Sequence, residues 1–514
     1  MTRSGNSRRS KKQDARAVKT SHEIISGNVK VVFIERPKKK AQANRIGGTC
    51  PADEQEALAG NYVRLLRIIM PGILAELSSL DDPRDQRRIT HPLSAIVLYG
   101  LLLFLCQIKS RREANRNIGG SQLSALMQEL VPDFESIPHA DTLDRLLEKT
   151  DVGGLEERYA SLLSDFISSG KLKEINPGRF LVAADGTQKF SRDHNWDDHA
   201  LSRNAGDPER ERYFAYMMES VLILPNGMVL PLLTEILENG ETLDGNGKQD
   251  CETKAFRRLA ARLVKLLGKG CVTILLDGLY ATGPTISLCE SYGWEYMVTL
   301  KKESLASVWK QFNAFRKLNT ENRLDVQYGD RRQVYSWANK IDYTYGGNNR
   351  RLVFNVVACT ETWTEEYPRK NKQPKETTSD YAWLTSFEIT GDNVFELCMK
   401  ARRRWRIENY FHVAKHQNNY SHCYSYNWKA MKGYHYLMKF ANFINALILH
   451  SQHTQDYVVA EGKKGTIEKA WSHILKKPID HFNAKSVPSK VMKPRASSRC
   501  AIVRYGKLDL CVTA

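Results

Sequence analysis

Two short apolar runs, each followed directly by Asp-Gly, most strongly constrain how this chain can fold. Residues 180–184 precede Asp185, and residues 272–276 precede Asp277. Runs of this length that are bounded by turn-forming residues are typical of buried strands, so we expect both Asp residues to lie at strand ends. In an α/β sheet, side chains just past the strand ends face the crevice where ligands bind.

The sequence around these runs predicts a mixed α/β core. Pro225-Asn226-Gly227 separates two further apolar runs, and Asn-Gly in such a place is a strong hairpin signal because both residues tolerate positive φ. A helix should then run from about residue 249 to Gly268, followed by a helix that begins at Pro284 and a strand at 295–300. This order of strands and helices is that of an α/β fold.

The regions on either side of this core have different patterns. Residues 320–390 alternate β-branched and aromatic side chains, which predicts strands, and Asp392 should start one long helix to about His416. An apolar helix should span 429–450. We therefore expect six parts along the chain: a flexible basic arm (1–50), a helical DNA-binding region (51–172), the first part of the core (173–302), a β-rich insertion (303–391), helices that complete the core (392–455) and a basic C-terminal tail (456–514).

The chain is basic, and the excess positive charge lies at its two ends. It has 76 Lys and Arg against 58 Asp and Glu, a net charge of +18. Residues 1–40 carry 12 basic and 3 acidic side chains, residues 462–514 carry the same numbers, and the body between them is net neutral. Two basic ends indicate a polyanionic partner, of which nucleic acid is the commonest, although solubilising tails have the same composition.

Cysteine spacing and hydropathy exclude several classes of protein. The 10 cysteines include no C-x-x-C pair, which argues against a zinc ribbon or a disulfide framework and favours a reducing compartment. The apolar stretch Pro92–Ile108 contains Gln107 and is flanked by charge. We expect a buried helix there, because a membrane span needs about 20 apolar residues. Nothing indicates nucleotide hydrolysis, since no P-loop is present.

A third acidic residue, Glu408, completes a candidate metal site with Asp185 and Asp277. Converging carboxylates repel one another unless cations lie between them, and Mg²⁺ prefers such oxygen ligands. Two such ions about 3.5–4 Å apart activate an attacking oxygen and stabilise the leaving oxygen in displacement at phosphorus. Each acid alone is equally well explained as a turn residue or a helix cap, so only the set of three predicts catalysis.

Two cations accompany Glu408 in the predicted helix. At about 100° per residue, Arg404, Glu408 and Lys415 fall within roughly 40° of one another, beside the apolar side of that helix. In this arrangement Glu408 could bind a metal ion while Arg404 and Lys415 hold the phosphates of a DNA backbone. The alternative is an exposed Arg–Glu pair, which stabilises a helix by only about 0.3–0.5 kcal/mol.

Three motifs together carry a resemblance to a known family. They are Asp185-Gly186-Thr187, Leu276-Asp277-Gly278 with Tyr280, and Arg404-x3-Glu408-x6-Lys415. These motifs resemble the catalytic set of bacterial insertion-sequence DDE transposases, in the group with a Tyr-x2-Arg-x3-Glu-x6-Lys signature. The resemblance covers roughly residues 180–450. Ala401 stands where that signature has Tyr, so the DNA contact made by the Tyr is unassigned in this chain.

The resemblance implies a fold and a chemistry. The fold is an α/β, ribonuclease-H-like mixed sheet with helices, and the β-rich insertion lies between Asp277 and Glu408. The activity is metal-dependent cleavage of insertion-sequence ends and their joining to target DNA, with Asp185, Asp277 and Glu408 holding two Mg²⁺ or Mn²⁺ ions.

The expected partner is double-stranded DNA, as terminal inverted repeats and as target, bound by a homodimer in the bacterial cytoplasm at the nucleoid. The residues expected to contact DNA are Arg404, Lys415, Arg402, Arg406, Lys301 and Lys302. Two alternatives stay open: a related nuclease that cuts without joining, and a catalytically silent DNA-binding protein derived from a transposase. The presence of all three acids favours the active enzyme over the silent protein.

Other polar clusters are weaker candidates. His194 and His199 enclose acidic residues, but without Cys partners a polar loop explains them better than a zinc site. The acids of residues 248–252 are explained as negative charge at a helix N-terminus. Glu235 follows a predicted strand and either supports the metal ligands or lies on the surface.

Overall fold

The structure of the protein is a computed structural model. It describes residues 20–26, 29–34, 52–451, 500–505 and 508–513, apart from gaps at 120, 132, 170–171, 173–175, 177, 208, 240–248 and 368–371. Most of the two basic ends lies outside these residues, so their contacts with nucleic acid stay predictions. The chain divides into unit 1, residues 1–42 and 273–404, and unit 2, residues 43–272 and 405–514.

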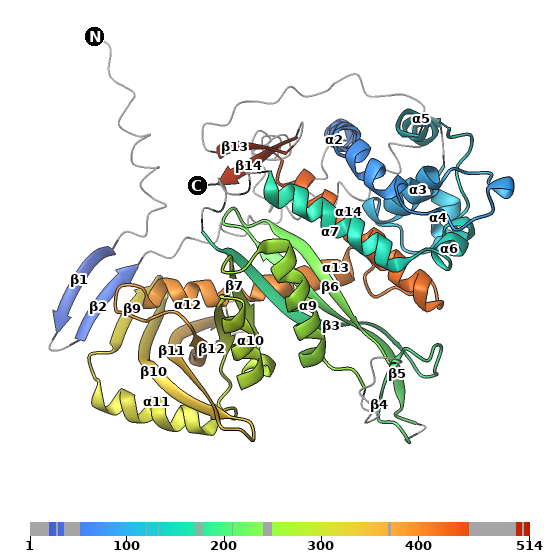
Figure 1. Ribbon diagram of the computed structural model, residues 1–514. Coiled ribbons are helices and arrows are strands. Elements are labelled where there is room, and N and C mark those ends of the chain that lie inside the picture. The colour runs from blue at the N-terminus through green and yellow to red at the C-terminus, as the bar shows by residue number, and fades with distance from the viewer. Residues whose placement is uncertain are drawn as a thin grey trace, which may run out of the picture. The chain divides into compact units, whose positions relative to one another are not determined.

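The N-terminal part of unit 2 is helical, as predicted (Figure 1). Its helices are α2 (Ala52–Ser78), the 3₁₀ turn η2 (Gln86–Arg88), α3 (Leu93–Leu105), α4 (Arg111–Asn117), α5 (Ser121–Leu130), α6 (Ala140–Leu147) and α7 (Val152–Ser168). Every residue of α3 from Ala95 to Leu105 is buried, so packing against protein explains its apolar sequence. Among the described residues, no helix is long and apolar enough to cross a membrane.

An antiparallel sheet follows in unit 2. Its strands are β3 (Phe180–Arg192), β4 (Leu201–Arg203), β5 (Arg212–Ile223) and β6 (Val229–Leu237), and β5 pairs with the other three. The predicted hairpin joins β5 to β6, and Gly227 in its turn has φ 87°. Helix α9 (Glu252–Leu267) ends at Gly268, whose φ of 93° only glycine adopts easily.

Two helices near the C-terminus complete unit 2. They are α13 (Trp405–His416), which packs against β3, β5 and β6, and α14 (Trp428–Leu449), which packs against α3, α6, α7 and β6. Helices α3 and α14 approach closely at Gly100, where a Cβ would lie 2.7 Å from Leu437 Cδ1. The apolar helix predicted at 429–450 is therefore the central packing element of this unit.

Unit 1 holds a mostly antiparallel sheet and its helices (Figure 1). The order of its strands is β1-β2-β9-β10-β11-β12-β8-β7, and only the β2–β9 and β7–β8 pairs are parallel. The strands are β1 (Thr20–Ser26), β2 (Val29–Ile34), β7 (Val272–Leu276), β8 (Glu295–Thr299), β9 (Arg323–Tyr328), β10 (Arg331–Tyr345), β11 (Arg350–Tyr367) and β12 (Lys372–Thr385). The other elements are η3 (Gly278–Tyr280), α10 (Gly283–Ser291), α11 (Ala306–Leu318) and α12 (Val394–Arg402).

Three features of the fold differ from the sequence-based expectation. Part of the N-terminal arm forms the β1–β2 hairpin, which pairs with β9. The β-rich insertion begins with α11, whose buried residues are only Val308 and Phe312, too few for apolar periodicity to reveal it. Two strands, β13 (Cys500–Tyr505) and β14 (Leu508–Thr513), pair within the C-terminal segment that was expected to be a tail.

The α3–α14 contact yields a test of the fold. Leu437 is fully buried, so Leu437→Ala should lower the free energy of unfolding by about 2–5 kcal/mol through lost burial and the cavity left behind. The measurement is the urea midpoint followed by circular dichroism. Leu318→Ala is the control, because Leu318 is 77% exposed and its truncation should change little. Equal midpoints for both variants would contradict this packing.

Candidate active site

Asp185 lies within a strand rather than at its end. Strand β3 continues to Arg192 and stays paired with β5, with a bulge before Phe190. The expected strand end was wrong because Asp-Gly usually marks a turn. Here Gly186 serves close packing instead, since a Cβ at this position would lie 2.6 Å from the carboxylate of Glu252.

A buried ionic cluster lies on the same face of the sheet as Asp185. Glu219 of β5 is paired with Asp185 in the β3–β5 register, and paired residues of neighbouring strands point to the same face. The Glu219 carboxylate is 0% exposed. It lies 2.9 Å from Nζ of Lys439 and 3.3 Å from Nε2 of His435, both on α14.

Hydroxyl groups complete the shell around this carboxylate. Thr234 of β6 donates a hydrogen bond of 2.6 Å to it, and Tyr420, which lies between α13 and α14, donates one of 2.9 Å. Nζ of Lys189 in β3 donates to the backbone oxygen of Tyr420 at 3.1 Å. The cluster therefore links three strands of unit 2 to α14 and to the segment that precedes it.

The cluster sets the protonation states of its members. Burial alone would raise the pKa of the Glu219 carboxyl, but Lys439, His435 and Thr234 outweigh burial and hold that pKa well below its ordinary range. Burial lowers the pKa of His435 to about 4, and Glu219 offsets this only in part, so the ring is neutral at pH 7. The sequence analysis missed this cluster. Its signal was a charged residue within an otherwise apolar strand and another within an apolar helix.

Asp277 lies at the end of β7, as predicted, and faces two cations of its own unit. Nζ of Lys301 is 3.2 Å from one carboxylate oxygen, and a guanidinium nitrogen of Arg404 is 4.0 Å from the other. Burial would raise the pKa of Asp277, but the Gly278 N–H, Lys301 and Arg404 outweigh it and lower that pKa. Gly278 lets the Lys301 side chain pass, because a Cβ there would lie 2.8 Å from it.

The long helix predicted from Asp392 is two helices, which corrects the stripe argument. Helix α12 ends at Arg402 and α13 begins at Trp405, with a turn between them. Arg404 lies in that turn, so it does not share a regular helical stripe with Glu408. The Arg404 side chain is only 11% exposed and its guanidinium is directed at Asp277, so the alternative of an exposed Arg404–Glu408 surface pair does not describe it.

Glu408 and Lys415 do lie on one helix, and both are partly buried. The buried side of α13 is the predicted apolar side, formed by Ile407, Phe411 and Ala414. Burial lowers the pKa of the Lys415 ammonium. Since α13 packs against β3, Glu408 and Asp185 belong to two elements in direct contact within unit 2.

The remaining cations predicted to bind DNA have different surroundings. Arg402 donates to Glu361 at 2.8 Å and lies 4.4 Å from the ring centre of Tyr381, so its guanidinium is held inside unit 1. Lys302 pairs with Asp380 at 2.8 Å on the surface, and Arg406 is exposed. Their contacts with DNA stay predictions.

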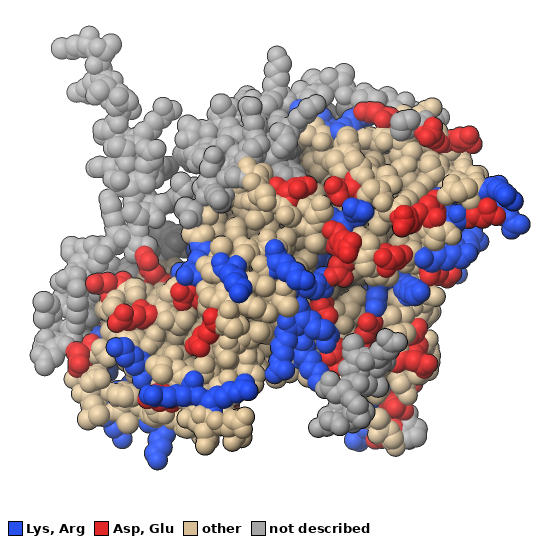
Figure 2. Space-filling model, viewed as in Figure 1, with Lys and Arg blue, Asp and Glu red and all other residues tan. Residues whose placement is uncertain are grey.

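On the face of the molecule shown in Figure 2, positive charge is local. Figure 2 shows Lys and Arg gathered over α9 and along α11, with both signs interspersed elsewhere on the visible face. Two of the α9 arginines, Arg258 and Arg262, bind Glu235 at 2.5 and 2.9 Å. Glu235 is thus a partner in structural ion pairs.

Within the part of the chain that the structure describes, no three His, Cys, Asp or Glu residues form a group that could hold a metal ion. Nδ1 of His194 contacts Asp193 at 3.0 Å, and Nδ1 of His199 contacts Asp197 at 2.6 Å, as in a polar loop. Asp185 and Glu408 belong to unit 2 and Asp277 to unit 1, so the set of three acids stays a prediction.

Known protein families match two stretches of the chain. Residues 250–442 match the family described as Transposase DDE domain, and residues 74–163 match the one described as DDE_Tnp_1-associated, together over half of the chain. The chain belongs to the DDE transposases of insertion-sequence type. Its mixed α/β architecture with a helical N-terminal region is consistent with the ribonuclease-H-like fold of such transposases. No curated protein matches the chain.

The matches locate the predicted residues within this DDE transposase. Asp277, Arg404, Glu408 and Lys415 lie inside the DDE-domain match, whereas Asp185 lies N-terminal to it. The second match covers the helical region from the end of α2 through most of α7. The family is thus established by the helical region and by the part of the chain that contains the second and third acids.

The buried cluster predicts how the stability of the transposase depends on pH. His435 takes up a proton near pH 6.5 when unfolded but only near pH 4 when folded, so the unfolded state binds more protons between these values. The free energy of unfolding should therefore fall by about 3 kcal/mol as pH drops from 6.5 to 4. The lowered pKa of Glu219 acts in the same direction at the acid end.

The measurement is the urea midpoint as a function of pH. His435→Gln removes the titrating ring and should flatten the dependence between pH 4 and 6.5. His416→Gln is the matched control, because His416 is exposed at the end of α13. If both variants keep the wild-type slope, His435 is not held neutral by burial.

Proposed function

We propose that this transposase cleaves DNA at the ends of an insertion sequence and joins them to target DNA by phosphoryl transfer, using Asp185, Asp277 and Glu408. The observation that carries the proposal is the environment of Asp277. It is an ionised carboxylate at a strand end, partly exposed, with Lys301 and Arg404 within 4.0 Å of it. A carboxylate beside cations suits a site that binds both a metal ion and a phosphodiester.

The donor set fits the expected cofactor. All three acids are partly exposed and offer only carboxylate oxygens, which Mg²⁺ and Mn²⁺ prefer. Two such ions, held by Asp185, Asp277 and Glu408, would supply activation of the attacking oxygen and stabilisation of the leaving oxygen.

The side chains of the transposase position the DNA strand. Arg404 has a planar guanidinium that can hold two phosphate oxygens at once, and its burial in the turn before α13 limits its motion. Lys415 and the exposed Lys301 act as point charges toward the backbone. The cleaved strand would be kept in place for joining by the same contacts, and we expect a homodimer to hold both ends.

Substitution of the acids tests the proposal. Asp185→Asn, Asp277→Asn and Glu408→Gln preserve side-chain size but remove a charged ligand, so each should abolish cleavage of DNA carrying the element's ends while DNA binding persists. Wild-type cleavage should be lost in EDTA and restored by Mg²⁺. Asp342→Asn is the control, because Asp342 is an exposed acid of unit 1 that pairs with Arg351.

Each result has a distinct meaning. Cleavage without joining would identify a nuclease, and DNA binding without cleavage by the wild type would identify a silent DNA-binding protein. Undiminished cleavage by any one of the three variants would remove that acid from the site.

Arg404 separates a phosphate clamp from a structural ion pair. Arg404→Lys keeps the positive charge beside Asp277 but loses the planar guanidinium that binds two phosphate oxygens. Turnover should therefore fall strongly while the melting temperature stays near wild type. A displacement of the scissile phosphate by about 1 Å lowers the rate on the order of 100-fold. Arg351→Lys is the control, since Arg351 is exposed in unit 1 and pairs with Asp342, away from the acids of the site. Equal turnover in wild type and Arg404→Lys would leave Arg404 with a structural role only.

A further inference from the structure

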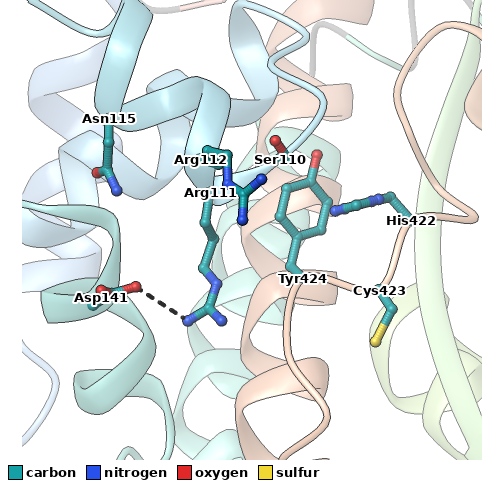
Figure 3. A pocket seen from close by; sticks show the side chains of 8 residues that line it. All are labelled: Ser110, Arg111, Arg112, Asn115, Asp141, His422, Cys423 and Tyr424. Atoms are coloured by element: carbon teal, nitrogen blue, oxygen red, sulfur yellow. Dashed lines mark ion pairs between the residues drawn. The ribbon is translucent and has the colours of Figure 1, made fainter.

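A pocket lies in unit 2, outside the acids discussed above (Figure 3). It encloses about 420 Å³ and is lined by Ser110, Arg111, Arg112, Asn115, Asp141, His422, Cys423 and Tyr424. Ser110 is the N-cap residue of α4, and Arg111, Arg112 and Asn115 lie within α4. Asp141 comes from α6, and the last three residues come from the segment before α14. In Figure 3 the arginines lie between Asn115 and Asp141 on one side and Tyr424 and His422 on the other.

The pocket is rich in hydrogen-bond donors. Arg112 is exposed and has no acidic partner within ion-pair distance among the described residues. Oδ1 of Asn115 accepts from the Ala140 N–H at 2.8 Å, which orients the amide and leaves its two N–H groups as donors. The Ser110 hydroxyl accepts from the Glu113 N–H at 3.1 Å, so its own hydrogen is a donor too.

The acid on the pocket wall is already compensated. Asp141 lies 3.6 Å from Arg111 and 3.4 Å from the His139 ring. Arg111 also pairs with Asp144, and these two acids hold its guanidinium at the pocket wall. Arg112 therefore contributes a positive charge that no neighbouring acid cancels.

The opposite wall of the pocket, formed by His422 and Tyr424, carries no charge. Burial lowers the pKa of His422, and Arg192, Lys189 and Arg111 lower it further, so its ring is neutral at pH 7. The Tyr424 hydroxyl is occupied, since it donates to the Ile108 backbone oxygen at 2.7 Å. The His422 and Tyr424 rings meet edge to face at 4.6 Å and form an uncharged wall.

We propose that this pocket binds a backbone phosphate of a DNA strand, with Arg112, Asn115 and Ser110 donating to the phosphate oxygens and the His422–Tyr424 wall against the adjoining sugar. Phosphate contacts of this kind position DNA without reading its sequence. The volume exceeds what a lone phosphate group needs, which favours a phosphate that carries its sugar. The site uses none of the catalytic acids, so it goes beyond the proposed function and is tested by binding alone.

The experiment measures the affinity of the full chain for a fluorescent DNA duplex of arbitrary sequence over a range of NaCl concentrations. Arg112→Ala should weaken binding about tenfold at low salt, the value of one charged hydrogen-bond contact. It should also reduce the slope of log K against log salt by about 0.9, since one phosphate contact is lost. Arg145→Ala is the matched control, because Arg145 is exposed on neighbouring α6 but does not line the pocket.

A second variant separates donors from charge. Asn115→Asp keeps an oxygen for the Ala140 N–H but replaces the amide donors with a negative charge, so DNA binding should weaken while the melting temperature is kept. Wild-type affinity and slope in both Arg112→Ala and Asn115→Asp would overturn the proposal.

Competition distinguishes a DNA phosphate from a small anion. Inorganic phosphate or a mononucleotide, added at constant ionic strength, should not displace the duplex at low millimolar concentration. Displacement from wild type but not from Arg112→Ala would show a small-anion site and overturn the assignment to DNA. If the wild type binds DNA and Arg112→Ala weakens that binding, but the wild type does not cleave, the result would count against the proposed function and not against the pocket.

Discussion

The buried ion pair of Glu219 and Lys439 is the interaction on which unit 2 depends. Removing two charges from water costs several kcal/mol for each, and only a full set of partners offsets that cost. Thr234, His435 and Tyr420 supply those partners. Because they come from β6, α14 and the segment before α14, the strands and the C-terminal helix can satisfy the charges only in one arrangement. Loss of one partner would leave a buried charge uncompensated, which costs about 3–5 kcal/mol.

This constraint bears on the site because the cluster shares a sheet face with Asp185. Glu219 is paired with Asp185 across β3 and β5, and α13, which carries Glu408, packs against the same strands. The position of these two acids within unit 2 therefore rests on buried polar contacts as well as on apolar packing. In unit 1, the Asp277 carboxylate is held by other contacts. It lies at a strand end, and the Gly278 N–H and two cations keep it ionised.

The arginines near α12 and α13 show how neighbouring identical residues acquire different roles. Arg402 is held by Glu361 and Tyr381 inside unit 1, while Arg404, two residues later, is directed at Asp277. Arg406 is exposed to solvent. A helical wheel treats all three as members of one surface. The break between Arg402 and Trp405 separates them, and the partners of Arg402 and Arg404 lie far away in the sequence.

Much of the fold could be predicted, because local patterns report local structure. Apolar runs located β7 and β8, Asn-Gly located the β5–β6 turn, and Gly268 marked the end of α9. The predicted end of β3 at Asp185 was wrong. Gly186 is there because the Glu252 side chain comes too close for a Cβ, and this contact cannot be seen in the sequence. The sequence did not predict helix α11 because this helix buries few side chains. It did not predict the Glu219 cluster because the members of the cluster are distant in sequence.

The sequence by itself determined the family, the α/β class and the burial of α3 and α14. It also gave the three acids and their neighbouring cations as candidates. Motifs and periodicity depend only on the order of residues along the chain, so all of these could be recognised without the structure. Only the tertiary structure decided that Arg404 faces Asp277, that Lys439 neutralises Glu219, and that Arg112 lines a pocket with Tyr424. These pairings join residues far apart in sequence. Their energies depend on desolvation and on the position of the partner charge, and folding alone establishes both.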